Sequence, residues 1–262
     1  MNSPYPLHQL FPGGDFAWAF RMRKAEPMNF FAPVDAGGEL MREKQVILDE
    51  HAERHLVVSD AAGPTLERLH ASLRDWGCML NDNNDLSSIA RQIEPDLIVM
   101  DQASQKLIAA AVCFPSSWNP AHWLDRPIHE IHEVVPQLNP QIGEMIAKFL
   151  RELKPGKAFQ RANWSFTRTA ELNYHPALER QPLDDTIALE DIHLRIEHQL
   201  FTAIEGAVVM GIRIQPIPLS SLREDQTLWQ NLIQVVETMP EDVARYKSLD
   251  RGKQPLVDLM RS

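Results

Sequence analysis

Cysteine is nearly absent from this sequence. The 262 residues contain two, Cys78 and Cys113, and no Cys-x-x-Cys pair. Zinc fingers, thioredoxin-like sites and cysteine-held iron–sulfur clusters need such pairs, so these classes are excluded for this chain alone. Because a disulfide framework is not expected from two distant thiols, the sequence predicts a reducing, cytoplasmic location.

Basic charge and long apolar runs are also scarce. Lys and Arg number 26 against 36 Asp and Glu, for a net charge of -10. This balance disfavours binding to nucleic acid or to anionic lipid. No stretch approaches the roughly 20 apolar residues of a membrane span. Prolines and the Gly13-Gly14 pair interrupt the N-terminus, so no signal peptide is expected.

The remaining composition is that of a globular protein, because 44% of the residues are hydrophobic and can form a core. Residues 1–36 are rich in prolines and aromatics, and we expect an irregular N-terminal segment along the surface. Residues 37–262 are predicted to form a single α+β domain.

Hydrophobic periodicity predicts helices on both sides of a mostly antiparallel sheet. Helices are expected at 39–54, 64–76, 140–152, 227–238 and 241–247, and strands at 96–101, 106–113, 158–166, 193–201 and 207–217.

The segment PIHEIHEVVP (127–136) concentrates two histidines and two glutamates within five residues. A zinc protease needs histidines at i and i+4 on a helix. Here the second histidine is at i+3, so that motif is set aside.

If the run 131–135 is extended, His129 and His132 face opposite sides. A single histidine among valines suits a haem axial ligand better than a zinc site. The residues alone favour a simpler explanation, a histidine hydrogen-bonded at a strand end.

Six segments together resemble one family, the haem-dependent oxidative N-demethylase catalytic subunits and relatives long filed as a domain of unknown function. The resemblance spans residues 28–240. The segments are DLIVM (96–100), AVCFPSSW (111–118), RPIHEIHEVVP (126–136), LKPGKAFQRANWSF (153–166), LRIEHQ (194–199) and GIRIQPIPL (211–219).

The resemblance implies a PAS-like antiparallel sheet with non-covalent haem b bound inside. It implies oxidation of a small secondary or tertiary methylamine by dioxygen, with release of formaldehyde. Electrons would come from a separate reductase that carries flavin, iron–sulfur and NADPH sites. The lack of Cys-x-x-Cys and Gly-x-Gly-x-x-Gly motifs agrees with this division of labour.

The Ile-His motif of the family falls on His132, which the resemblance makes the ligand of the haem iron, with His129 as the fallback. Arg195 and Arg161 lie in two further motifs and would anchor the haem propionates, because arginine forks suit carboxylates. For Arg195, an ion pair with a surface acid remains an alternative.

Glu197 lies on the same strand face as Arg195 and is the expected catalytic residue, where it would bind a protonated amine or shuttle protons. A salt bridge to Arg195 or Arg161 is its alternative role. Asn163, Phe114 and Trp118 complete the expected cofactor-binding set, although Phe114 and Trp118 could instead cap the preceding strand. Trp164 is expected in the core.

This sequence departs from the family pattern at several positions. Val134 replaces the first proline of Ile-His-x-Pro-Val-Pro, and His198 replaces an arginine near the expected propionates. Tyr174-His175 stands where a phenylalanine motif is usual, and Tyr174 is expected to replace that packing. No role follows for His175. These changes keep two alternatives open: a PAS-like haem or small-ligand sensor without turnover, and a structural protein that has lost haem.

Overall fold

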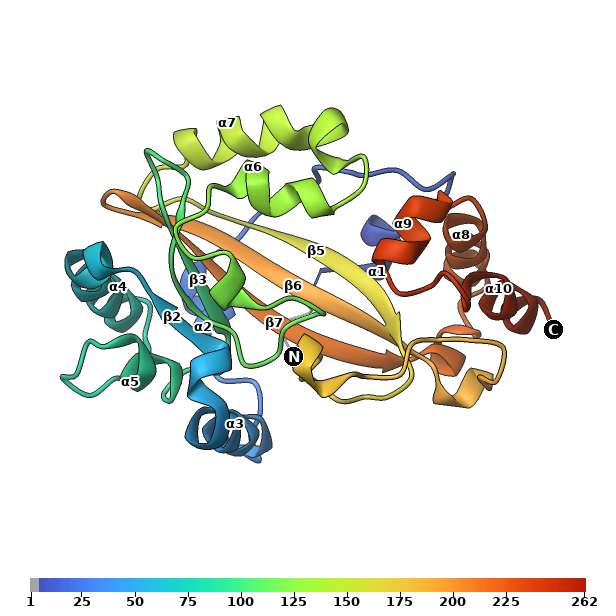
Figure 1. The fold of residues 1–262 in the computed structure, drawn as a ribbon, viewed down its shortest axis with the longest axis horizontal. Helices are drawn as coiled ribbons and strands as arrows, with labels where there is room; N and C mark the ends of the chain where they lie inside the picture. Colours follow the sequence, from blue (N-terminus) through green and yellow to red (C-terminus); the bar gives the residue numbers. More distant parts are fainter. Residues whose placement is uncertain (1–4) are drawn as a thin grey trace.

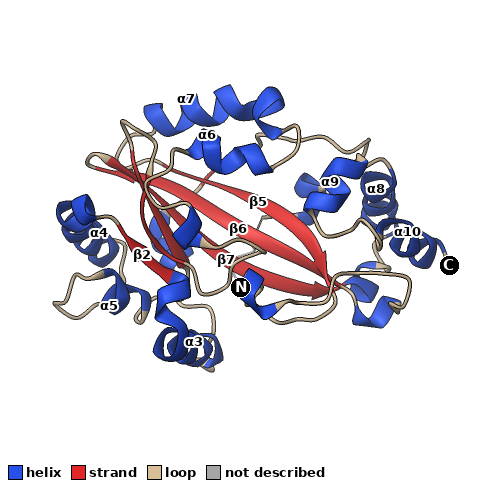
Figure 2. Cartoon of the chain, in the orientation of Figure 1, coloured by secondary structure: helices blue, strands red, loops and turns tan. Residues whose placement is uncertain are grey.

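One seven-stranded sheet forms the centre of the structure. The computed structural model describes residues 5–262, and the strand order is β1-β5-β6-β7-β3-β4-β2 with every neighbouring pair antiparallel. Figure 2 shows the long strands crossing the molecule. The strands are β1 (Arg23–Lys24), β2 (Leu56–Val58), β3 (Asp96–Asp101), β4 (Leu107–Ala111), β5 (Ala158–Thr167), β6 (His193–Ile204) and β7 (Ala207–Pro218).

Helices surround this sheet, which confirms the predicted α+β class. In Figure 1, α3 to α5 lie at one end of the long strands, α8 to α10 at the other, and α6 and α7 along one side. Among the described residues, no helix has the length and apolar character needed to cross a bilayer. The helices are α1 (Leu7–Leu10), α2 (Pro27–Phe31), α3 (Glu39–His55), α4 (Gly63–Asp75), α5 (Leu86–Ala90), α6 (Ile128–Ile131), α7 (Glu144–Glu152), α8 (Gln226–Glu237), α9 (Glu241–Tyr246) and α10 (Lys253–Arg261).

The β6–β7 hairpin fixes the register of the site. Only Glu205 and Gly206 separate the two strands, and Gly206 adopts φ +75°, a conformation that glycine reaches without strain. On the other side of β6, Asn163 of β5 pairs with Glu197. Two polar residues far apart in the sequence therefore lie side by side on one sheet face.

The two faces of the sheet support different cores, because side chains alternate along each strand. On β3, Leu97 and Val99 pack with the cluster of α3 to α5, whereas Ile98 and Met100 pack with the cluster under α6 and α7. The second face carries the site described below.

The N-terminal segment contains short regular elements and some buried side chains within a largely irregular stretch. It contains α1, β1 and α2, and its Phe11 and Phe31 side chains are buried in two of the cores. Residues 1–4 of the predicted segment lie outside the described residues, and the domain boundary at residue 36 stays a prediction. The proline-rich composition did not indicate that some aromatic side chains of this segment are buried against the sheet and helices.

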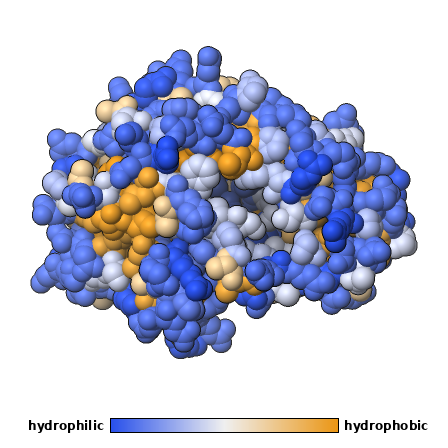
Figure 3. All heavy atoms as spheres, viewed as in Figure 1, coloured by the Kyte–Doolittle hydropathy of each residue, from blue (hydrophilic) through white to orange (hydrophobic). Residues whose placement is uncertain are grey.

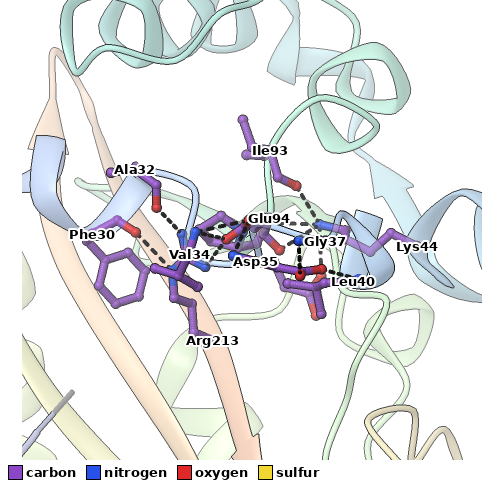
Figure 4. Close-up of polar contacts among 12 residues, drawn as sticks. Phe30, Ala32, Val34, Asp35, Gly37, Leu40, Lys44, Ile93, Glu94 and Arg213 are labelled. Carbon is purple, nitrogen blue, oxygen red and sulfur yellow. Dashed lines mark hydrogen bonds and ion pairs between the residues drawn. The ribbon is translucent and has the colours of Figure 1, made fainter. Parts of the chain in front are cut away.

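A buried polar cluster ties this segment to the sheet (Figure 4). Glu94 accepts hydrogen bonds from the backbone N–H groups of Val34 and Asp35 and forms an ion pair with Arg213 of β7. Arg213 also donates to the backbone oxygen of Phe30. Burial raises the pKa of Glu94, but Arg213 and the two amides outweigh this effect and keep its pKa below the ordinary value.

Candidate functional site

A cavity of about 710 Å³ lies against the face of the sheet that α6 and α7 cover. This volume falls within the roughly 300–1,000 Å³ of typical small-molecule sites. Figure 3 shows a hollow in the middle of the face viewed, between α6 and α9 in the orientation of Figure 1. The cavity therefore has both an enclosed interior and an opening to solvent.

The cavity changes from apolar to polar along β6. Phe201 lies within the apolar cluster under α6 and α7, and the next cavity-facing residues are Gln199, Glu197 and Arg195. Alternation along the strand places all four on one side. A ligand with an apolar body and a polar or charged edge matches this gradient.

His132 lies over this gradient, but not on the extended strand considered from the sequence. The chain forms α6 and then a 3-10 turn at His132–Val134, because local bonds such as Val135 N–H to His132 O replace strand pairing. His132 lines the cavity, and its ring has no hydrogen-bond partner among residues 5–262. Burial, helped by the nearby Arg161 charge, lowers the pKa of His132 to about 4. The imidazole is therefore neutral at pH 7, the form that binds metals.

His129, the fallback ligand, is exposed and does not line the cavity. The described part of the chain also contains no group of three His, Cys, Asp or Glu side chains placed to hold a metal ion. His132 is thus the histidine of this motif that the fold brings to the cavity, as a single residue.

Glu197 faces the cavity with its carboxylate held by two amides. Asn163 donates to Oε2 at 3.4 Å and Gln199 donates to the same oxygen at 3.1 Å. Within the described chain, Glu197 has no ion pair with Arg161 or Arg195 within 4.0 Å, so the salt bridge considered from the sequence is not formed. The carboxylate is oriented, and its Oε1 is left for a ligand.

Arg161 lines the same cavity from β5, and no residue from 5 to 262 accepts a hydrogen bond from its guanidinium or pairs with it. Burial lowers its pKa, and the charge of Glu197 offsets part of this effect. A guanidinium stays protonated at any physiological pH, so Arg161 brings a positive charge into the cavity.

Arg195 is fully buried and uses its guanidinium inside the protein. It donates to Ser116 Oγ and to the backbone oxygens of Phe114, Pro115, Glu171 and Leu172. Its surface ion-pair alternative is wrong, because the side chain is 1% exposed. The propionate role stays a prediction, and these contacts favour Arg161 over Arg195 for it.

The other predicted contacts divide between the cavity and the cores. Asn163 and Trp118 line the cavity. Phe114 does not, since its side chain packs in the core beside α3 to α5. Trp164 is buried in the core with α8 and α10, as expected, and also borders the cavity. Tyr174 is buried and packs its ring 5.1 Å from the Arg195 guanidinium carbon.

His198 corrects one expectation drawn from the family pattern. It points to the opposite side of β6, where Nδ1 accepts the Tyr5 N–H and Nε2 bonds to Gln215 Oε1. The arginine-to-histidine difference therefore removes no charge from the cavity. Val134 is 54% exposed at the cavity rim.

Two cavity residues had no local signal in the sequence. Trp18 reaches the cavity from the N-terminal segment and donates its indole N–H to Pro136 O at 2.8 Å. Lys247 follows α9 and donates Nζ to Trp164 O at 2.7 Å. Only tertiary folding brings these distant segments to one site.

A comparison with known families gives a match over most of the chain. The family model described as "Haem-dependent oxidative N-demethylase, alpha subunit-like" matches residues 43–257. The match includes β2 to β7, α6, α7 and α9, whereas Trp18 precedes it.

Proposed function

The chain belongs to the haem-dependent oxidative N-demethylase alpha subunit-like family, and from this premise we propose that it binds haem b in the cavity and oxidises a small secondary or tertiary methylamine. Dioxygen is the proposed oxidant, and formaldehyde and the demethylated amine are the proposed products. The substrate, the haem type and the electron donor are parts of this proposal.

The observation that carries the proposal is His132. Its neutral imidazole reaches the cavity without a hydrogen-bond partner among the described residues. The side chain is half-buried, so its ring nitrogens are open to the cavity instead of being bonded within the protein. An unpartnered neutral ring beside an apolar chamber would suit a histidine that binds a haem iron.

The rest of the cavity fits the same group. The cluster under α6 and α7 offers an apolar chamber for the macrocycle, and Arg161 offers a cation for a propionate. Trp118 and Asn163 would contact the cofactor from the cavity wall. When bound, haem would supply the activation of dioxygen, chemistry that no side chain of this cavity can perform.

Glu197 has the properties of a substrate-binding carboxylate. Asn163 and Gln199 hold Oε2, so Oε1 would accept the N–H of a protonated methylamine. This contact would fix the amine's orientation, and the carboxylate would take its proton when the free amine is needed. The apolar wall, including Phe201, would exclude bulk water from the reacting end.

Oxidation with dioxygen also requires two electrons and two protons from outside the amine. The described residues contain two cysteines, one buried and one half-buried, and both have pKa values raised by burial. Neither thiol has the low pKa of a redox-active cysteine. A separate reductase carrying flavin, iron–sulfur and NADPH sites is the proposed electron donor.

The test is an ultraviolet–visible spectrum of protein purified from haem-supplemented cells, oxidised and reduced. Wild type is expected to show a haem band, and His132→Ala to lose or shift it. The matched control is His129→Ala, three residues away and exposed, which is expected to keep the wild-type band.

Three results would contradict parts of the proposal. An unchanged band in His132→Ala rejects this ligand, and no band in wild type rejects the haem enzyme. If haem binds but no methylamine yields formaldehyde with a reductase and dioxygen, the chain is better explained as a haem-binding sensor.

A further inference from the structure

Three cations, Arg161, Arg195 and Lys247, line the polar end of the cavity, and the family motifs include the two arginines but not the lysine. Lys247 is 8% exposed and lines the cavity together with Arg161. Its Nζ lies 4.7 Å from the Trp164 ring centroid and 5.4 Å from that of Trp18. Burial lowers the pKa of Lys247 to about 8, and the Arg161 charge contributes to the decrease. Lys247 is still mostly protonated at pH 7, so two like charges line the same cavity.

Two other enclosed cations of the described chain, Arg213 and Lys44, have carboxylate partners that Arg161 and Lys247 lack. Arg213 pairs with Glu94, and Lys44 lies 3.3 Å from Asp96 and donates to three backbone oxygens. The Lys44 and Arg213 contacts are drawn in Figure 4. Buried charges normally require such neutralisation.

The nearest acid does not neutralise the cavity pair directly. Glu197 raises the pKa values of both Arg161 and Lys247, so its charge acts on both. Its Oε2 is nevertheless occupied by Asn163 and Gln199, and within residues 5–262 no carboxylate lies within 4.0 Å of either cation. Glu197 faces three cations there, Arg161, Arg195 and Lys247, which leaves this end of the cavity with an excess positive charge.

We propose that Arg161 and Lys247 together form a carboxylate-binding site at the polar end of the cavity. Arg161 offers a planar fork with free N–H donors, and Lys247 has N–H groups beyond the one that bonds to Trp164 O. An enclosed carboxylate there would remove the repulsion between the two cations and satisfy their donors.

Two sources of carboxylate fit this site, and both rest on the proposed function. One is a propionate of the cofactor. The other is a methylamine substrate that itself carries a carboxylate, such as an N-methylated amino acid, whose ammonium group would meet Glu197 while its carboxylate met the two cations. The shared chemistry is a carboxylate beside an apolar body.

The first experiment uses the full chain stripped of bound small molecules, with glutarate as the probe and thermal unfolding as the readout. Wild type is expected to be stabilised by glutarate more than by sodium chloride at equal ionic strength. Lys247→Met keeps the length of the side chain without its charge and is expected to weaken the apparent glutarate affinity by about tenfold or more, as when one partner of an enclosed charge pair is lost.

Three further variants make this result specific. Arg161→Met is expected to weaken glutarate binding similarly, which tests the site even if Lys247→Met folds poorly. Lys247→Arg is expected to retain binding. Lys148→Met removes an exposed lysine of α7 and is the matched control with wild-type behaviour. Equal responses to glutarate and chloride in wild type, or equal glutarate affinity in wild type and both Met variants, would overturn the proposal.

The second experiment identifies the source of the carboxylate. Haem dimethyl ester has the same ring as haem without free carboxylates, so a cofactor-binding site predicts that wild type prefers haem and that Lys247→Met loses this preference. A substrate-binding site predicts instead that N,N-dimethylglycine perturbs the haem band at lower concentration than dimethylamine does, in wild type but not in Lys247→Met. If neither preference depends on Lys247, the site binds neither source and the proposal fails.

These outcomes are separable from failure of the proposed function. A chain that binds no haem contradicts the haem enzyme, yet the glutarate titration still decides whether Arg161 and Lys247 bind a carboxylate. Conversely, a haem band that depends on His132 but a glutarate response that ignores both cations would keep the enzyme and reject the carboxylate site.

Discussion

Three arginines on adjacent strands illustrate how the surroundings of a residue decide its role. Arg213 pairs with a carboxylate, Arg195 is surrounded by backbone oxygens, and Arg161 faces the cavity without a partner among residues 5–262. The family motifs made Arg161 and Arg195 equivalent candidates for a propionate. Their hydrogen bonds distinguish the two arginines, because a guanidinium that already donates most of its N–H groups within the protein has few donors left for a ligand.

Replacement of Glu197 tests the residue proposed to bind the amine. Glu197→Gln keeps the shape of the side chain and removes its charge, so we expect amine turnover to fall by roughly 10²–10⁴-fold while the haem band stays. The measurement is formaldehyde release together with the spectrum. Glu205→Gln, at the exposed β6–β7 turn, is the control expected to behave as wild type. Full activity of Glu197→Gln would rule out this role.

At the scale of elements, the long strands β5, β6 and β7 carry the polar half of the site, and a close approach on the other face of β7 holds α2. Gly211 lies in β7, where an added Cβ would be 2.8 Å from Phe30 Cε1 and 3.1 Å from Phe31 Cζ. Real Cβ atoms do not approach ring carbons so closely without displacement. Glycine at this position therefore lets the N-terminal segment pack directly against the sheet.

This packing predicts the effect of a single methyl group. Gly211→Ala is expected to destabilise the protein by about 1–3 kcal/mol, because overfilling a packed interface forces side chains or backbone to shift. Gly63→Ala is the matched control, since an added Cβ there meets nothing within 4 Å and alanine favours a helix. Urea unfolding of both variants measures the difference. If Gly211→Ala and Gly63→Ala had equal free energies of unfolding, α2 would have to shift without a loss of stability, which would contradict the prediction.

At the scale of the whole molecule, the cavity is enclosed by segments from both ends of the chain. Trp18 comes from the N-terminal segment and Lys247 from the C-terminal helices, and the Lys247 ammonium lies over the rings of both Trp18 and Trp164 of β5. The charge is also distributed unevenly: the chain carries -10 overall, whereas three cations, Arg161, Arg195 and Lys247, line the polar end of the cavity.

Histidine burial predicts how stability depends on pH. His198 accepts the Tyr5 N–H at Nδ1, so protonation would set two donors against each other, and burial lowers its pKa to about 4. The unfolded chain then binds a proton between pH 6.5 and 4 that the folded chain does not, and stability falls as pH decreases through this window. We expect this residue to contribute a loss of about 2 kcal/mol between pH 7 and pH 5.

The measurement is the free energy of unfolding by urea at pH 7 and pH 5 in wild type and His198→Gln. The variant is expected to be less stable at pH 7 and to show a smaller decrease at pH 5. Because His132, His55 and His175 also have pKa values lowered by burial, wild type can lose more than His198 alone accounts for. A decrease of equal size in both proteins would contradict the assignment to His198.

The sequence by itself determined the α+β class, the long strands and most helices, because their hydrophobic periods are local and strong. It also placed His132, Arg161 and Glu197 in the family motifs. It missed α10 and short elements such as β2, whose patterns are weak, and it did not identify the turn of helix at 128–134, which is held by local hydrogen bonds.

Only the tertiary structure decided which of these residues share a cavity. It turned His198 away from the site, left His129 in solvent, enclosed Arg195 among backbone oxygens and brought Lys247 beside Arg161. The physical reason is that alternation along a strand determines which face of the sheet a side chain is on. Its neighbours on that face are determined by the pairing register of the strands and by helices far away in the chain.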